Sequence, residues 1–186
     1  MKEIEEKLDQ ELKSRYLKLV EEVNEEVVEA LVFNFPSRNF EDYIQTFESC
    51  LPFLKGFNNY EATGFSILAK KKAEDGVDLI KDYLEMVKIT REKEVDQTIL
   101  VFSGAYWFPK LLKLVILKKE SQILKYVVKA VIELETASHI YTMEAEIFGG
   151  KKPRSVGEFL DLLTRNYERI EKEEEPYKAI RELMFE

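Results

Sequence analysis

The sequence predicts an all-α protein, a bundle of about six to eight helices. Apolar residues recur at steps of three and four along most of the 186 residues, and this is the periodicity of amphipathic helices. No stretch alternates at period two, as a half-buried strand would. Helix-capping residues, Gly and Pro separate the periodic segments. A chain of this length can hold a complete core without disulfides or metals.

Composition limits the partners and the location that we expect. Lys and Arg total 28 against 36 Asp and Glu, so the net charge is −8. Duplex DNA and anionic membranes are therefore repelled on average, and neither is an expected partner. Only Cys50 carries a thiol, which excludes an intrachain disulfide and the zinc sites that need two or four cysteines.

The opening residues are acidic where a signal peptide is basic and then apolar, and no apolar window of about 18 residues occurs. We expect a cytoplasmic protein that does not span a membrane. The many Glu and Lys residues, with few Gln, also resemble the composition of proteins from hot environments.

Helix breakers divide the first half of the chain into four predicted helices, at residues 4–31, 40–54, 59–74 and 78–108. The first is one long amphipathic helix that Asn34-Phe35-Pro36 ends. Ser37 or Asn39 can cap the second, and Pro52 should kink or restart it. The third stops at Asp75-Gly76, and Asp78 is a good N-cap for the fourth.

The second half gives four more helices, at residues 109–119, 123–147, 155–170 and 177–184. Pro109 suits the first turn of the first of these. Gly149-Gly150 can end the long helix predicted at residues 123–147. Ser155 lies three residues before Glu158, and this spacing predicts a capping box at the start of the next helix.

One short run, KAEDGVDL from Lys72 to Leu79, resembles the signature of the RsbR-type stressosome sensor domains, which are non-haem members of the globin-coupled sensor group. In that family a helix ends in an Arg-Ala-Glu-Gln-Gly-Val-Pro-Leu-like run and the next helix starts at once. Here Asp78 replaces the frequent Pro. The order of helices also fits over about residues 16–147, and residues 148–186 lie outside the resemblance.

The resemblance implies a globin-like helical domain at residues 1–150, followed by a C-terminal helical extension at 151–186 that packs on the same domain or on a partner. It implies a sensor that is often dimeric. In haem-binding relatives the iron-ligating histidine lies four residues before the equivalent glycine, and Lys72 occupies that position here. Lysine is protonated at neutral pH unless it is buried, so we expect no haem and no other cofactor.

The chain has few candidates for catalysis. His139 is the only histidine, and Glu135 shares its helix face four residues earlier. Because Thr136 occupies the position three residues before His139, the Glu-x-x-His pattern of di-iron bundles is missing. We expect a partly buried or interfacial histidine bonded to Glu135, and an inert Cys50 in the core. An enzyme is therefore not the expected class.

Aromatic and small residues in the string FSGAYWFPK, residues 102–110, leave two possibilities open. Ser103, Gly104 and Ala105 allow either a close helix approach or a ligand cavity. Core packing is the commoner outcome for such a string. The side chains that would line an apolar cavity are Phe65, Tyr83, Phe102, Tyr106, Trp107 and Tyr141.

Two functions remain open. The first is a non-catalytic sensor or signalling module of non-haem globin type, dimeric, which binds an apolar small molecule and acts within a signalling complex. The second is a helical adaptor protein without a small-molecule ligand, which docks partners by laying apolar helix faces into grooves.

Overall fold

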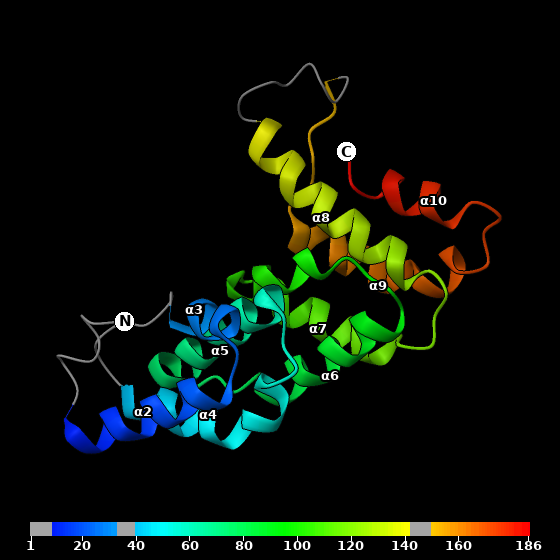
Figure 1. Cartoon of the computed structure of the whole chain (residues 1–186). Coiled ribbons are helices and arrows are strands. Elements are labelled where there is room, and N and C mark those ends of the chain that lie inside the picture. Colours follow the sequence, from blue (N-terminus) through cyan, green and yellow to red (C-terminus); the bar gives the residue numbers. More distant parts are fainter. Residues whose placement is uncertain (1–8, 33–39, 142–149) are drawn as a thin grey trace. The chain divides into compact units, whose positions relative to one another are not determined.

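The computed structural model describes residues 9–32, 40–141 and 150–186 of the chain (Figure 1). Over these ranges the protein is all-α, as predicted. The described helices are α2 (Gln10–Glu22), α3 (Glu25–Val32), α4 (Phe40–Leu54), α5 (Asn59–Asp75), α6 (Ile80–Glu92), the 3₁₀ helix η1 (Gln97–Gly104), α7 (Phe108–Leu117), α8 (Leu124–Tyr141), α9 (Val156–Ile170) and α10 (Pro176–Glu182). An isolated antiparallel bridge joins Pro153 and Phe185. None of these helices is long and apolar enough to cross a membrane.

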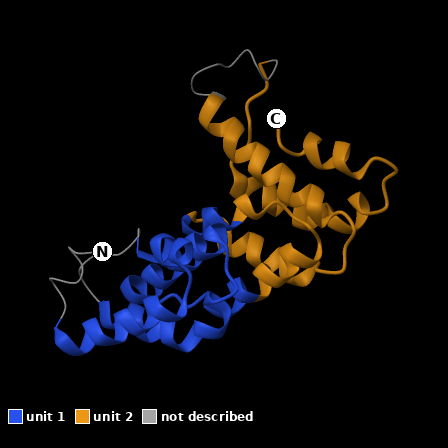
Figure 2. Ribbon diagram, viewed as in Figure 1, with its two compact units in different colours: residues 1–84, 100–104 blue, residues 85–99, 105–186 orange. Residues whose placement is uncertain are grey.

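The chain forms two compact units (Figure 2). Unit 1 comprises residues 1–84 and 100–104, and unit 2 comprises residues 85–99 and 105–186. This division does not coincide with the boundary expected at residue 150. Helix α9 packs on α7 and α8, and α10 packs on α8 and α9, all inside unit 2.

Unit 1 is built around α4 and α5. Helix α2 lies against α4, and α3 lies against α5. An aromatic cluster fills the interior, where the ring of Phe65 lies 5.8 Å from the rings of both Phe47 and Phe57. Burial of these large side chains stabilises unit 1.

The prediction of one continuous opening helix was wrong, because the helix breaks at Val23-Asn24. Val23 is extended, with φ −118° and ψ 152°. The side-chain oxygen of Asn24 accepts a hydrogen bond from the backbone N–H of Val27 at 2.9 Å, so Asn24 caps a new helix. The apolar stripe continues through this point, and periodicity alone therefore hid the break. The predicted breaker and caps between Asn34 and Asn39 lie outside the described residues.

The fourth predicted helix was too long. Helix α6 ends at Glu92, and Glu94 takes a left-handed backbone with φ 51°. Asp96 then accepts from the backbone N–H of Thr98 at 2.9 Å and starts η1. Asp favours such local bonds over continuing a helix. The helix does not restart at Pro52, because α4 continues through this residue to Leu54, and the expected kink there stays a prediction.

In unit 2, helices α7 and α9 run in the same direction. A Cβ on Gly157 would lie 3.4 Å from the ring of Tyr106, Lys110 bonds Asp161, and Lys118 lies over the ring of Tyr167. These pairs advance together along both helices, which fixes a parallel arrangement. Pro109 in the first turn of α7 and the Ser155–Glu158 capping box at α9 confirm the predicted helix starts. Helix α8 is described to Tyr141, and its predicted continuation to residue 147 lies beyond the described part.

Candidate functional site

The run Lys72 to Leu79 forms the helix stop and restart that the sequence predicts. Gly76 caps α5 in the left-handed conformation, with φ 72°, and donates its N–H to the carbonyl oxygen of Lys72 at 3.0 Å. Asp78 accepts from the N–H of Ile80 at 3.2 Å, where α6 begins. The ammonium of Lys72 lies 3.1 Å from the carboxylate of Asp78, so the pair ties the two helix ends together.

Two of the three predicted pocket residues in unit 1, Phe65 and Tyr83, are core residues. Phe65 and Tyr83 are both 0% exposed and Phe102 is half-buried. Tyr83 donates its hydroxyl to the carbonyl oxygen of Glu61 at 2.6 Å. A methyl group on Gly64 would lie 2.4 Å from the Tyr83 hydroxyl and 2.4 Å from the carbonyl oxygen of Leu100. The space between Gly64, the Tyr83 hydroxyl and the Leu100 carbonyl is therefore too small for even one more methyl group.

The small residues of the 102–110 string make a close helix approach in unit 1. The Ser103 hydroxyl donates to the carbonyl oxygen of Gly64 at 3.0 Å. A Cβ on Gly104 would lie 3.2 Å from the side chain of Ile67. An apolar cavity in unit 1 lies elsewhere, between α2, α3 and α4, and has a volume of about 20 Å³. That volume suits about one water molecule and is far below the size of ordinary ligand pockets.

The remaining predicted pocket residues belong to unit 2 and differ from one another in exposure. Trp107 is 2% exposed, and its ring lies 6.3 Å from the ring of Phe108. Tyr106 is 76% exposed, and its ring lies 3.4 Å from the position that a Cβ on Gly157 would occupy. The side chain of Tyr141, at the end of α8, lies outside the described residues. Trp107 is thus a core residue and Tyr106 a surface one.

The two candidate catalytic side chains lie in different settings. Cys50 is buried in unit 1, and burial raises the pKa of its thiol. A raised pKa leaves little of the reactive thiolate at neutral pH. His139 Nε2 lies 3.4 Å from Glu135 Oε1, which is the predicted pair. The His139 side chain is 77% exposed, so it is not partly buried, and the interfacial alternative stays a prediction. The described residues contain no group of three His, Cys, Asp or Glu side chains that could hold a metal ion.

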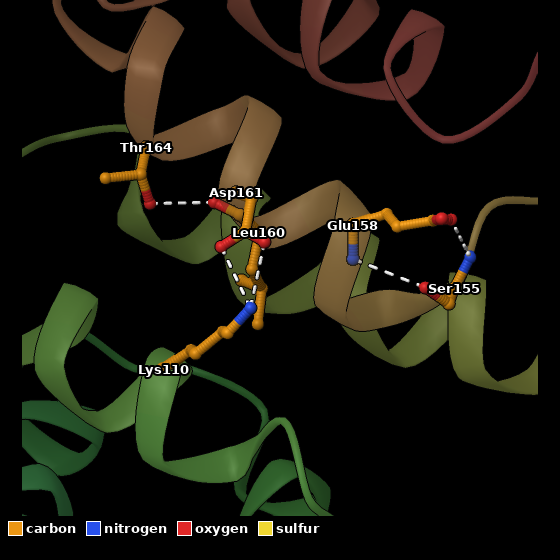
Figure 3. Close-up of polar contacts among 6 residues, drawn as sticks. All are labelled: Lys110, Ser155, Glu158, Leu160, Asp161 and Thr164. Atoms are coloured by element: carbon orange, nitrogen blue, oxygen red, sulfur yellow. Dashed lines mark hydrogen bonds and ion pairs between the residues drawn. The ribbon is translucent and has the colours of Figure 1, made fainter.

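Polar contacts between α7 and α9 organise one face of unit 2 (Figure 3). Lys110 Nζ donates to both carboxylate oxygens of Asp161, at 3.0 and 2.9 Å. At the start of α9, Ser155 Oγ accepts from the N–H of Glu158, and Glu158 accepts from the N–H of Ser155. These groups satisfy one another, which makes them a structural frame rather than a reactive site.

A groove of about 570 Å³ lies in unit 2 beside α10. Charged side chains of both signs surround two aromatic ones. Its lining comprises Lys151, Lys178 and Arg181, Glu175, Glu182 and Glu186, and Tyr177 and Phe185. We call this site the α10 groove. Its volume lies in the range of ligand sites.

Glu133 on α8 holds the wall of the α10 groove in place. The hydroxyl of Tyr177 donates to Glu133 Oε1 at 2.7 Å, and Arg181 Nε lies 3.6 Å from Glu133 Oε2. The Tyr177 ring lies 5.5 Å from the ring of Tyr126 and 4.8 Å from the ammonium of Lys129. These contacts hold two lining side chains, Tyr177 and Arg181, in place.

Sequence reasoning missed this groove because the contact that holds its wall in place joins residues far apart in the chain. Tyr177 and Glu133 are separated by 44 residues. No local spacing connects them, and only the packing of α10 on α8 brings them together.

No protein-family model, curated protein or solved structure matches this chain. The likeness to RsbR-type sensor domains therefore stays a prediction from residues 72–79 and from the order of the helices.

Proposed function

We propose that the protein is a non-catalytic helical interaction module that binds a segment of a partner protein in the α10 groove. The observation that carries this proposal is the lining of the groove. Tyr, Phe and Arg are enriched where proteins bind one another, and a polar rim surrounds such contacts. Tyr177, Arg181 and Phe185 are of these types, and charged side chains of both signs flank them.

Preorganisation supports the same proposal. Binding costs free energy when flexible side chains must be ordered at the interface. Here Glu133 already fixes Tyr177 and Arg181, through the 2.7 Å hydrogen bond and the 3.6 Å ion pair. A mixed-charge, open groove also suits a peptide better than it suits a lipid or another wholly apolar molecule.

A phage-displayed library of random dodecapeptides tests the proposal. Peptides selected on the wild-type protein should bind at least about tenfold more weakly to Phe185→Ala and to Lys178→Glu, as expected for changes at an interface hot spot. Lys113→Glu is the matched control, because Lys113 is an exposed lysine of α7 in the same unit. The proposal fails if no peptide is enriched, or if the selected peptides bind all three variants equally.

A sensor of non-haem globin type is the second candidate, favoured by the geometry of residues 72–79. The left-handed Gly76 and the immediate restart at α6 are what the resemblance to that family implies. Native mass spectrometry of the purified protein separates the two candidates. A co-purified apolar small molecule would favour the sensor, whereas a clean apo mass that fatty acids do not shift would count against it.

A further inference from the structure

Helix α2 is attached to unit 1 through contacts that a second copy of the chain could supply equally well. Its main packing partner is α4. Arg15 bonds Glu48 through two hydrogen bonds of 2.9 and 2.6 Å. About two helical turns further along α2, Glu22 bonds Lys55 at 2.7 Å. Both pairs join residues 33 positions apart, so α2 and α4 run parallel in a single register.

The hinge between α2 and α3 is short. Only Val23 and Asn24 separate Glu22 from Glu25. The bend depends on the extended backbone of Val23 and on the side-chain cap that Asn24 supplies to Val27. Short hinges favour the exchange of an element between copies, because a short connection leaves the chain little freedom to turn back on itself in the unexchanged form.

The apolar pattern fits a second arrangement in which this hinge is helical. Tyr16, Leu19 and Val23 continue at helical spacing into Val27 and Leu31, as one face of a straight helix requires. Straightening would carry Tyr16 and Leu19, now 3% and 8% exposed, away from their own α4. These apolar side chains would then need another cover, and α4 of a second copy offers both the apolar surface and the matching charges.

The bent form leaves a small apolar pocket at this junction. The pocket has a volume of about 20 Å³, lies where α2, α3 and α4 meet, and is lined almost wholly by apolar side chains. We propose that α2 exchanges between two copies of this chain, with Val23-Asn24 straightening so that α2 of each copy packs on α4 of the other. This proposal does not depend on the function of the α10 groove.

Two hinge variants with opposite expected effects test the exchange by sedimentation velocity over a range of concentrations. Asn24→Ala removes the cap that the bent form needs. It should favour the straight hinge about fivefold, and so raise the association constant of a dimer with two hinges about 25-fold. Glu25→Pro places proline at the first position of α3, which the bent form accepts. A straight helix would lose on the order of 100-fold per hinge, so the dimer should disappear.

A charge-exchange experiment reports on the swap itself and does not disturb the hinge. Arg15→Glu alone and Glu48→Arg alone each place like charges across the α2–α4 contact. In an exchanged dimer of one copy of each variant, both contacts again join opposite charges. The equimolar mixture should therefore dimerise about fivefold more strongly than either variant alone.

Circular dichroism of each variant checks that it has folded. Three results would overturn the proposal: no dimer of the wild type or of Asn24→Ala at any concentration, a dimer that survives Glu25→Pro, or a charge-variant mixture that associates no better than its components.

Discussion

Gly64 shows how one residue sets the packing of the unit 1 interior. A Cβ at this position would meet the carbonyl oxygen of Leu100 and the hydroxyl of Tyr83, both at 2.4 Å. Because one obstacle is backbone, a rotamer change cannot relieve the contact. We expect Gly64→Ala to lower the free energy of unfolding by about 1 to 3 kcal/mol, as overpacking usually does. Urea unfolding measures this loss.

Gly56→Ala is the control for that change. Its Cβ would lie 3.7 Å from the carbonyl oxygen of Phe53, which is an ordinary contact. The free energy of unfolding should move by no more than about 0.5 kcal/mol. Equal losses at the two glycines would contradict the assignment of close packing to Gly64.

Buried tyrosines in unit 1 should make stability depend on pH in the alkaline range. Burial raises the pKa of Tyr83 well above its usual value, and burial also raises the pKa of Tyr43. Below about pH 10 these groups are protonated in both the folded and unfolded chain, so their contribution is complete. Above that pH the unfolded chain loses protons first, and the free energy of unfolding falls as pH rises.

Tyr83→Phe tests this, because phenylalanine cannot ionise. The slope of unfolding free energy against pH above pH 10 should become shallower by up to about 1.4 kcal/mol per pH unit. Tyr60→Phe, at a side chain that is 45% exposed, is the control. An unchanged slope in Tyr83→Phe would show that Tyr83 does not carry the effect.

At the scale of the elements, the α5–α6 corner depends on the conformation of Gly76. Its φ of 72° is left-handed, and no atom lies within 4 Å of the position that a Cβ would occupy. Substitution there is therefore costly for conformational reasons alone. Gly76→Ala should lower the free energy of unfolding by about 1 kcal/mol, and Gly76→Asn by less, because Asn tolerates this region better. Chemical unfolding of the two variants gives the comparison, and an Ala variant as stable as wild type would contradict it.

Helix boundaries were predictable where a residue type such as Gly or Pro imposes them. They were missed where a side-chain hydrogen bond to the backbone starts a new segment within a continuous apolar periodicity. The end of α5 was predictable from Gly76. The starts of α7 and α9 were predictable from Pro109 and from the Ser155–Glu158 pair. Asn24 and Asp96 also begin new segments, but through bonds that depend on the chain already having turned. Periodicity carried the predicted helices straight through both points.

The candidate site was less predictable than the helices for a related reason. Small residues permit either a cavity or a close approach, and only the distance between α5 and η1 separates the two outcomes. The 3.0 Å bond from Ser103 to Gly64 decides for close approach. The α10 groove depends instead on Glu133 and Tyr177, whose meeting is a property of the folded unit.

At the scale of the whole molecule, the division into units predicts the result of removing residues 151–186. Side chains of α9 that are at most 1% exposed pack inside unit 2, among them Phe159, Leu163 and Tyr167. Their loss would uncover the apolar faces of α7 and α8 that α9 contacts. A fragment of residues 1–150 should therefore keep the dispersed amide signals of unit 1 and lose those of α7 and α8 in ¹H–¹⁵N spectra. If instead the fragment behaved as one complete domain, with α7 and α8 protected from hydrogen exchange, residues 151–186 would be a true extension and α9 would not belong to the core of unit 2.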